Sequence, residues 1–343
     1  MTEHPSPPRG GGSAPLLVEI VRGDMVESRH TVRYAAVDAA GRRIAWRGAV
    51  ESPVYPRSAN KMLQALPLLE TGAAERWGLG DAELALACAS HHGEPRHVET
   101  VLRWLERMGL SAADLECGSH MPYHEPSAAA LIRRGAAPGP AHNNCSGKHS
   151  GFLATALHEG EPPRGYIRAD HPVQRRVTRT LAEIYGIDLE RAPQGIDGCG
   201  IPVIGVPVEK LALGMARLAD PSGLPAGRRE AALRIRKAVA GEPFMVSGSR
   251  GFCTHVIEGL GGRALVKTGA EGVFCMALTD LGIGVAIKAE DGASRAAEAV
   301  VAHLLEGFGL IDEALGRALA AVLHPPVFNR AGRAVGAVRV NAG

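Results

Sequence analysis

The sequence lacks any long block of one charge. Its 38 lysines and arginines face 36 acidic residues, which gives a formal net charge of +2, and both signs are spread along the chain. A protein that binds nucleic acid needs a basic stripe or patch to neutralise phosphates. We therefore expect no nucleic-acid partner.

Long apolar runs are also missing. No run is long enough to span a bilayer, so we expect no membrane partner. The first fifteen residues are rich in proline and glycine and have no apolar core of the kind a secretory signal requires. They predict a disordered tail over 1–14 and a cytoplasmic location.

Close cysteine pairs are absent. The six cysteines stand far apart in the chain: Cys88, Cys117, Cys145, Cys199, Cys253 and Cys275. Without a secretory signal, this spacing is typical of a reducing compartment with free or metal-bound thiols. For any single thiol, burial as a packing residue is the simpler interpretation.

Lysine is scarce: the chain has six lysines among its 38 basic residues, and the other thirty-two are arginines. A GC-rich coding sequence is one explanation for this bias. A retained lysine is nevertheless enriched for work that arginine cannot do, such as giving up its proton. Three of the six, Lys61, Lys148 and Lys267, lie in segments rich in glycine, serine or cysteine.

Strand patterns gather at both ends of the chain and helical patterns lie between them. The predicted strands are 16–21, 32–38, 43–46, 264–268, 273–278, 284–288 and 334–340. This order predicts an α/β (α+β) fold in which one antiparallel sheet is built from both termini and carries a helical insertion. We expect a single catalytic domain over 15–343.

The densest polar stretch is 142–151, which reads His-Asn-Asn-Cys-Ser-Gly-Lys-His-Ser-Gly. A hydrophobic core has no use for so many polar groups, because each would need a buried partner. The stretch precedes a helical pattern carried by Phe152, Leu153, Ala156 and Leu157. It predicts a helix whose first turn aims polar atoms into a cleft.

Two short motifs suggest acyl transfer. Ser58-Ala59-Asn60-Lys61 has the Ser-x-x-Lys form, at the start of a helix predicted over 57–66, and Lys267-Thr268-Gly269 lies in a late strand. Each is weak alone, and an exposed helix start is the plain alternative for the first. Together they follow the order used by serine β-lactamases and penicillin-binding proteins.

The chemistry of such a pair is demanding. A serine hydroxyl attacks only when a base takes its proton. Lysine serves as that base when burial or a second cation lowers its pKa from about 10.4 to about 7–8. We hypothesise that Lys61 and Lys267 lower each other's pKa, with Ser58 as nucleophile and Ser90 as proton relay.

Cys145 and Cys199 raise the possibility of zinc, which accepts sulfur and nitrogen donors. His142 or His149 is the nitrogen ligand that general chemistry favours. The spacing is poor for a metal motif, so on the residues alone two unrelated thiols are the simpler interpretation.

Taken together, these segments resemble the bacterial L-asparaginase II family, the zinc-dependent, rhizobial-type class 3 enzymes. The similarity lies in 57–61, 88–94, 143–151, 196–202, 252–253 and 267–272. The resemblance implies a serine β-lactamase-like fold, a homodimer, and hydrolysis of L-asparagine to L-aspartate and ammonia. It pairs Ser58 with Lys61 and Ser90 with Lys267, and it assigns zinc to Cys145, Lys148 and Cys199.

For the substrate, Arg57 or His91 is expected to bind the α-carboxylate and Asp197 the ammonium group. Further substrate contacts are expected from Asn144, Gly198 and Thr268. Two other functions stay open on the residues alone. One is a penicillin-recognising serine hydrolase, and the other is a non-catalytic, zinc-stabilised protein that binds an amino acid.

Overall fold

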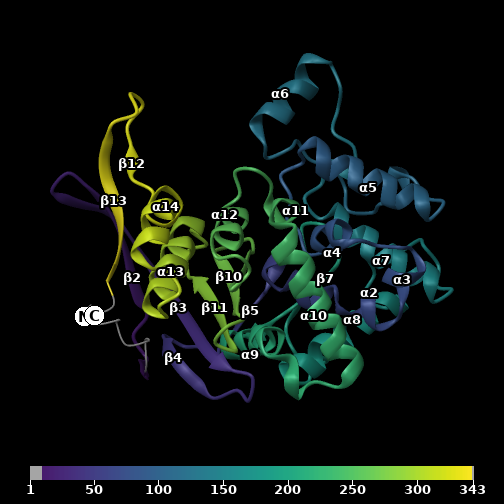
Figure 1. The fold of residues 1–343 in the computed structure, drawn as a ribbon, viewed down its shortest axis with the longest axis horizontal. Coiled ribbons are helices and arrows are strands. Elements are labelled where there is room, and N and C mark those ends of the chain that lie inside the picture. Colours follow the sequence, from purple (N-terminus) through teal and green to yellow (C-terminus); the bar gives the residue numbers. More distant parts are fainter. Residues whose placement is uncertain (1–9, 342–343) are drawn as a thin grey trace. The chain divides into compact units, whose positions relative to one another are not determined.

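The computed structural model describes residues 10–341 (Figure 1). The chain, expected to form one catalytic domain, divides into two compact units. Unit 1 contains the chain up to Ala59, Val206–Asp220 and the chain from His255 onward; unit 2 contains Asn60–Gly205 and Pro221–Thr254. Of the tail expected over 1–14, residues 1–9 lie outside the described part. Gly10–Gly12 form strand β1, which pairs in parallel with β4.

Unit 1 is built on a sheet in which, among the described residues, nine strands take part. Its main path runs β12-β13-β2-β3-β11-β10-β9, and β4 with β1 joins at β3. The strands are β2 (Leu16–Arg22), β3 (Met25–Asp38), β4 (Arg43–Arg47), β9 (Ala264–Thr268), β10 (Val273–Leu278), β11 (Ile283–Ala289), β12 (Val327–Phe328) and β13 (Ala334–Asn341).

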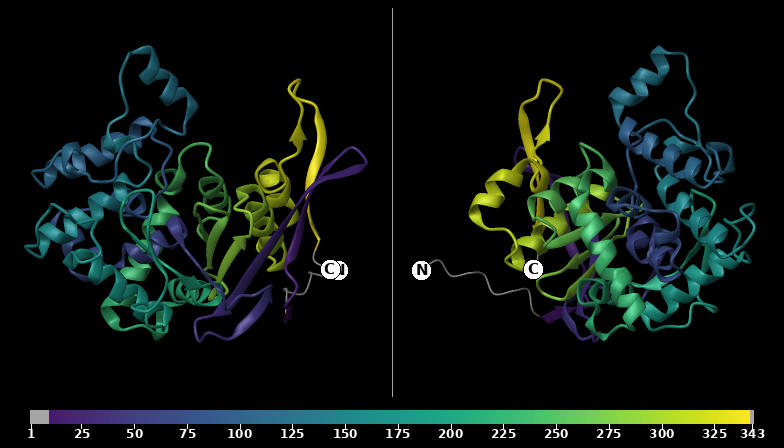
Figure 2. Two further views of the ribbon diagram at one scale, coloured as in Figure 1. Left: turned by 180° about the vertical axis from the view of Figure 1, so that it is seen from behind. Right: turned by 45° about the vertical axis from the view of Figure 1, so that its right-hand side comes forward.

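Both ends of the chain meet in this sheet. The C-terminal strand β13 pairs antiparallel with β2, with Val340 opposite Val18. The long β3 pairs with β2 and β4 along one edge and with β11 along the other. Figure 2 shows β3 running the length of the sheet beside its partners. The predicted antiparallel sheet from both termini is therefore confirmed.

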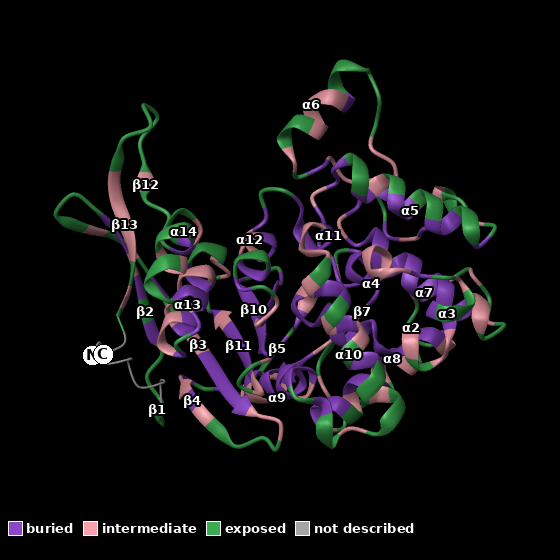
Figure 3. Ribbon diagram, in the orientation of Figure 1, coloured by how far each residue is buried: buried purple, intermediate pink, exposed green. Residues whose placement is uncertain are grey.

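Helices cover the central strands of unit 1. They are α9 (Val208–Ala219), α13 (Ser294–Gly307) and α14 (Glu313–Leu323), and α12 (Phe252–Gly259) crosses the boundary between the units. α9 packs on β3, β10 and β11, and α13 packs on β10, β11 and β13. Every residue of β10 is buried, as its unbroken apolar sequence requires (Figure 3). The short strands β5 (Pro53–Val54) and β8 (Val206–Pro207) pair separately.

Unit 2 is the helical insertion that the sequence predicts. Its helices are α1 (Lys61–Gln64), α2 (Leu66–Glu70), α3 (Ala73–Arg76), α4 (Asp81–Ala87), α5 (Pro95–Arg107), α6 (Glu125–Arg133), α7 (Ser146–His158), α8 (Pro172–Tyr185), α10 (Ala226–Gly241) and α11 (Pro243–Ser247). A hairpin joins β6 (Gln194–Ile196) to β7 (Pro202–Ile204). α7 is the central helix, because Ser146 through Ala156 are all buried and α2, α3, α4, α5 and α8 pack on it.

The prediction of one continuous helix over 57–66 is wrong. The structure has a 3-10 turn at Arg57–Asn60, then α1, then α2. Pro67 explains the second break, because it has no N–H to donate to the carbonyl of Leu63 and so cannot continue the helix of α1.

Within residues 10–341, no helix combines the length and the apolar character needed to cross a membrane.

Candidate functional site

A completely buried lysine starts α1 in unit 2. Lys61 is 0% exposed, and its Nζ donates hydrogen bonds to the carbonyl of Ala89, to Ser90 Oγ at 3.1 Å and to Cys145 Sγ at 3.2 Å. The structure thus brings Lys61 together with Ser90. A buried amine in contact with a hydroxyl is the arrangement that serine activation needs.

The loop that carries Ser90 follows α4 and is held by backbone hydrogen bonds. The N–H of Ser90 donates to Val246 O at 3.0 Å, and the N–H of His91 donates to Asn144 O at 3.2 Å. These two bonds tie the loop to α11 and to the segment that precedes α7. Ser90 is therefore positioned by neighbours distant in sequence.

His91 holds this loop through hydrogen bonds of both ring nitrogens. It is 0% exposed, its Nε2 bonds to Ser146 Oγ at 2.8 Å, and its Nδ1 accepts from the N–H of Gly93 at 3.1 Å. Burial lowers the pKa of His91 well below its usual value, and the neighbouring His97 and Lys61 add to this. A neutral ring with both nitrogens engaged suits a positioning role better than the predicted binding of the substrate carboxylate.

Cys145 is fixed just before α7 by an asparagine that the sequence analysis did not single out. Asn143 Oδ1 accepts from the N–H of Cys145 at 2.8 Å, and its Nδ2 donates to Cys117 O at 2.8 Å. An Asn that accepts from the backbone two residues later is a known turn device. In the sequence, the doublet Asn143-Asn144 is the signal that could have indicated this turn.

The two predicted zinc thiols lie together in unit 2. A hydrogen bond between them raises the pKa of Cys145, with burial in the same sense, and lowers the pKa of Cys199. Lys148 Nζ donates to Cys199 Sγ at 3.1 Å. Burial alone lowers the pKa of Lys148, but the charges of Cys199, Cys145 and Asp197 outweigh it and raise the pKa.

This donor set fits zinc by its chemistry, because two sulfurs and one amine nitrogen are types of donor that zinc accepts. A ligating lysine must first lose its proton, as thiols must. No group of three or more His, Cys, Asp or Glu side chains in residues 10–341 is placed to hold a metal. The predicted zinc ligands include only two residues of these four types, Cys145 and Cys199, because the third ligand is Lys148.

The loop between β6 and β7 presents Cys199. Asp197 Oδ1 accepts from the N–H of Gly198 at 2.7 Å, and the N–H of Asp197 donates to Ile201 O at 2.9 Å. Asp197 is half-buried and Gly198 is exposed. Asn144 is also half-buried, and its N–H donates to His120 Nε2 at 2.9 Å. Asp197, Gly198 and Asn144 are all predicted to contact the substrate, and all three belong to unit 2.

His149 is hydrogen-bonded to Tyr166, a residue that no sequence motif indicated. Its Nδ1 lies 2.7 Å from the Tyr166 hydroxyl, which also accepts from the N–H of Glu116 at 2.8 Å. Burial, with the charge of Lys148, lowers the pKa of His149 to about 3. His142, the other proposed nitrogen ligand, bonds through Nδ1 with Gly139.

Ser58 and Lys267, the other two predicted catalytic residues, lie on neighbouring segments of unit 1. A Cβ on Gly269 would lie 2.9 Å from Pro56 O and 3.0 Å from the nitrogen of Ala59, so the end of β9 packs directly on the turn that holds Ser58. Lys267 is 0% exposed, and its Nζ donates to Thr268 O at 2.8 Å. Only glycine at 269 permits this approach.

Arg57, also in unit 1, has a left-handed backbone conformation with φ of 52°. This region is unfavourable for residues with a side chain, and such strain tends to occur at functional sites. The strained residue directly precedes Ser58. The observation agrees with a site at this turn.

Comparison with solved structures gives matches of low sequence identity. A crystal structure of Mglu matches with a TM-score of 0.44 and 15% identity over 82% of this chain, which spans 62% of that protein's length. An unliganded simvastatin synthase from Aspergillus terreus matches with a TM-score of 0.38 and 11% identity, over 89% of this chain and 94% of the other. A β-lactamase from Mycobacterium bovis matches with a TM-score of 0.36 and 13% identity, over 84% and 94%.

No curated protein matched the sequence. The family model for L-asparaginase II matches residues 18–340, which is nearly the whole chain and includes every predicted site residue. The chain belongs to the L-asparaginase II family.

Proposed function

We propose that the protein hydrolyses the side-chain amide of L-asparagine to give L-aspartate and ammonia. Family membership supports an amidohydrolase of this type. The observation that carries the proposal is Lys61, a fully buried lysine whose Nζ reaches the hydroxyl of Ser90 and the thiol of Cys145. A surface charge needs no such burial, whereas a base that must lose its proton does.

The proposed reaction proceeds through an acyl-enzyme. Ser58 is the nucleophile and Lys61, three residues later in the chain, accepts its proton. The serine oxygen forms a bond to the amide carbon, the C–N bond breaks, and the lysine returns the proton so that ammonia leaves. Water then cleaves the ester and releases L-aspartate. Backbone N–H groups are the proposed donors to the oxyanion.

The remaining roles follow from charge. Arg57 is the proposed partner of the substrate α-carboxylate, since His91 is fully buried with both ring nitrogens bonded. Asp197 is the proposed partner of the ammonium group. Ser90 is the proposed relay, because its hydroxyl accepts a hydrogen bond from Lys61 Nζ. A homodimer remains part of the proposal.

Zinc is proposed to be held by Cys145, Lys148 and Cys199, where it would act as a Lewis acid that orients the substrate. In this chain, the hydrogen bond between the two thiols and the bond from Lys148 to Cys199 hold the three donor atoms together.

The activity is tested by ammonia release from L-asparagine. The native protein is expected to be active, and Ser58→Ala to lower kcat by about 10⁴-fold or more, as loss of a nucleophile does. Ser13→Ala, at an exposed position of unit 1, is the matched control and should retain full activity.

Two results would contradict this assignment. If Ser90→Ala abolished turnover while Ser58→Ala kept it, Ser90 would be the nucleophile. Nitrocefin hydrolysis without ammonia release from asparagine would favour the penicillin-recognising alternative.

Removal of zinc is expected to raise KM for L-asparagine more than it lowers kcat, because the metal is proposed to orient the substrate. The measurement is steady-state kinetics before and after dialysis against a chelator, followed by addition of zinc. A large fall in kcat with an unchanged KM would instead indicate a direct part in the chemistry.

A further inference from the structure

Gln64, in α1 of unit 2, carries a buried carbonyl oxygen without a partner. The residue is 8% exposed, and its Oε1 accepts no hydrogen bond among the described residues. Buried polar atoms are nearly always hydrogen-bonded, so each exception calls for an explanation. Gln64 lies one turn after Lys61, and no sequence motif predicts a role for it.

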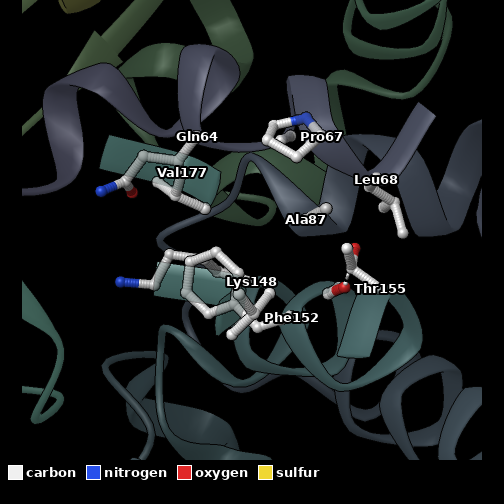
Figure 4. Close-up of a pocket in the computed structure, with 11 residues that line it drawn as sticks. Gln64, Pro67, Leu68, Ala87, Lys148, Phe152, Thr155 and Val177 are labelled. Carbon is white, nitrogen blue, oxygen red and sulfur yellow. Dashed lines mark hydrogen bonds between the residues drawn. The ribbon is translucent and has the colours of Figure 1, made fainter. Parts of the chain in front are cut away.

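This side chain shares a cavity wall with Lys148. The cavity is lined otherwise by mostly apolar groups of α2, α4, α7 and α8. Figure 4 shows the amide of Gln64 and the amine of Lys148 extending to the same side of the cavity, whereas Leu68 and Thr155 lie at the other end. The unpaired oxygen of Gln64 and the proposed zinc ligand Lys148 thus belong to residues that line the same cavity.

The amine of Lys148 needs more acceptors than it has. It is 3% exposed, and its Nζ donates to Cys199 Sγ at 3.1 Å. A lysine that gives its lone pair to a metal keeps two N–H groups, which point away from the metal. In a buried site each of these requires an acceptor from the protein.

We propose that Gln64 is a positioning residue for Lys148, whose amine N–H donates to Gln64 Oε1 so that the lone pair is directed to zinc. The inference rests on the zinc assignment of the proposed function. Residues that hydrogen-bond to a metal ligand orient the atom that binds the metal. Their loss weakens metal affinity by about 10–100-fold.

Two other acceptors fit this role less well. Asn60 Oδ1 is also buried without a partner, but Asn60 does not line the cavity, and its Nδ2 donates to the Tyr185 hydroxyl at 3.1 Å. Thr155 also lines the cavity, but Figure 4 shows it at the opposite end from the amine of Lys148.

The test compares Gln64→Met, Gln64→Glu and Thr155→Val in the full chain. Zinc affinity is measured by competition with a chromophoric chelator, and stability is measured by urea unfolding of the metal-free protein. Gln64→Met should bind zinc about 10–100-fold more weakly. Its metal-free unfolding midpoint should be unchanged or higher, because an unpaired buried oxygen is removed.

The other two variants separate positioning from packing. Gln64→Glu keeps an acceptor and should restore affinity to within about threefold of the native protein. Thr155→Val changes the far end of the same cavity and should leave zinc affinity unchanged. A merely structural role would lower the metal-free midpoint of Gln64→Met and leave its zinc affinity intact.

The inference is overturned if Gln64→Met binds zinc as tightly as the native protein, or if Thr155→Val loses as much affinity. If the native protein binds no zinc yet hydrolyses asparagine, this inference and the zinc assignment fail while the proposed activity stands. If zinc affinity responds to Gln64 as expected but no ammonia is released, the proposed activity fails alone.

Discussion

Lys61→Met is expected to lower kcat/KM for L-asparagine by about 10²–10⁴-fold, the usual contribution of a general base. Methionine matches the length and buried character of the lysine side chain but has no group that accepts a proton. The native Nζ bonds to Ser90 Oγ at 3.1 Å and to Cys145 Sγ at 3.2 Å, and both bonds are lost. Ammonia release at saturating and at low substrate measures the effect.

Two further variants separate the base from its charge. Lys61→Arg keeps a cation but cannot give up its proton at neutral pH, so it should be nearly as inactive as Lys61→Met. Lys237→Met removes an exposed lysine of α10 in the same unit and should leave activity unchanged. An active Lys61→Arg would mean that this position supplies only positive charge.

Gly147→Ala is expected to destabilise the protein by about 3 kcal/mol, the upper part of the range for overpacking. A Cβ at 147 would lie 2.3 Å from Leu86 O and 2.5 Å from Leu86 Cγ, so the first turn of α7 would have to move away from the end of α4. Backbone at this contact cannot yield as a flexible side chain does. Urea unfolding of the two proteins gives the difference.

Gly151→Ala, one turn further along α7, is the matched control. Its Cβ would make only ordinary contacts, the shortest of them 3.5 Å to Leu68 Cδ2. Alanine is the better helix former, so this variant is expected to be more stable by about 0.5–1 kcal/mol. Equal losses of stability from the two variants would show that the contact with Leu86 does not explain the cost of a Cβ at 147.

Local patterns were sufficient for most of the sheet, but they missed β1, β12 and the first half of β3. The strands expected at 264–268 and 273–278 match β9 and β10, because both are short apolar segments ended by glycine-containing turns. The helix over 57–66 was mispredicted because the helical spacing of apolar residues continues through Pro67. The backbone hydrogen bonds of α1 do not continue, since Pro67 has no N–H to donate. Periodicity reports which side chains are apolar, not whether each backbone bond forms.

The sequence by itself determined the family, the antiparallel sheet from both termini, and the candidate lysines, serines and thiols. These depend on residue type and near spacing, which are local. Only the tertiary structure decided that Lys61 contacts Ser90, that Asn143 fixes Cys145, and that Gln64, with an unpaired oxygen, lines the same cavity as Lys148. Hydrogen bonding and burial depend on which segments distant in sequence pack together. The spacing of residues along the chain does not indicate which segments these are.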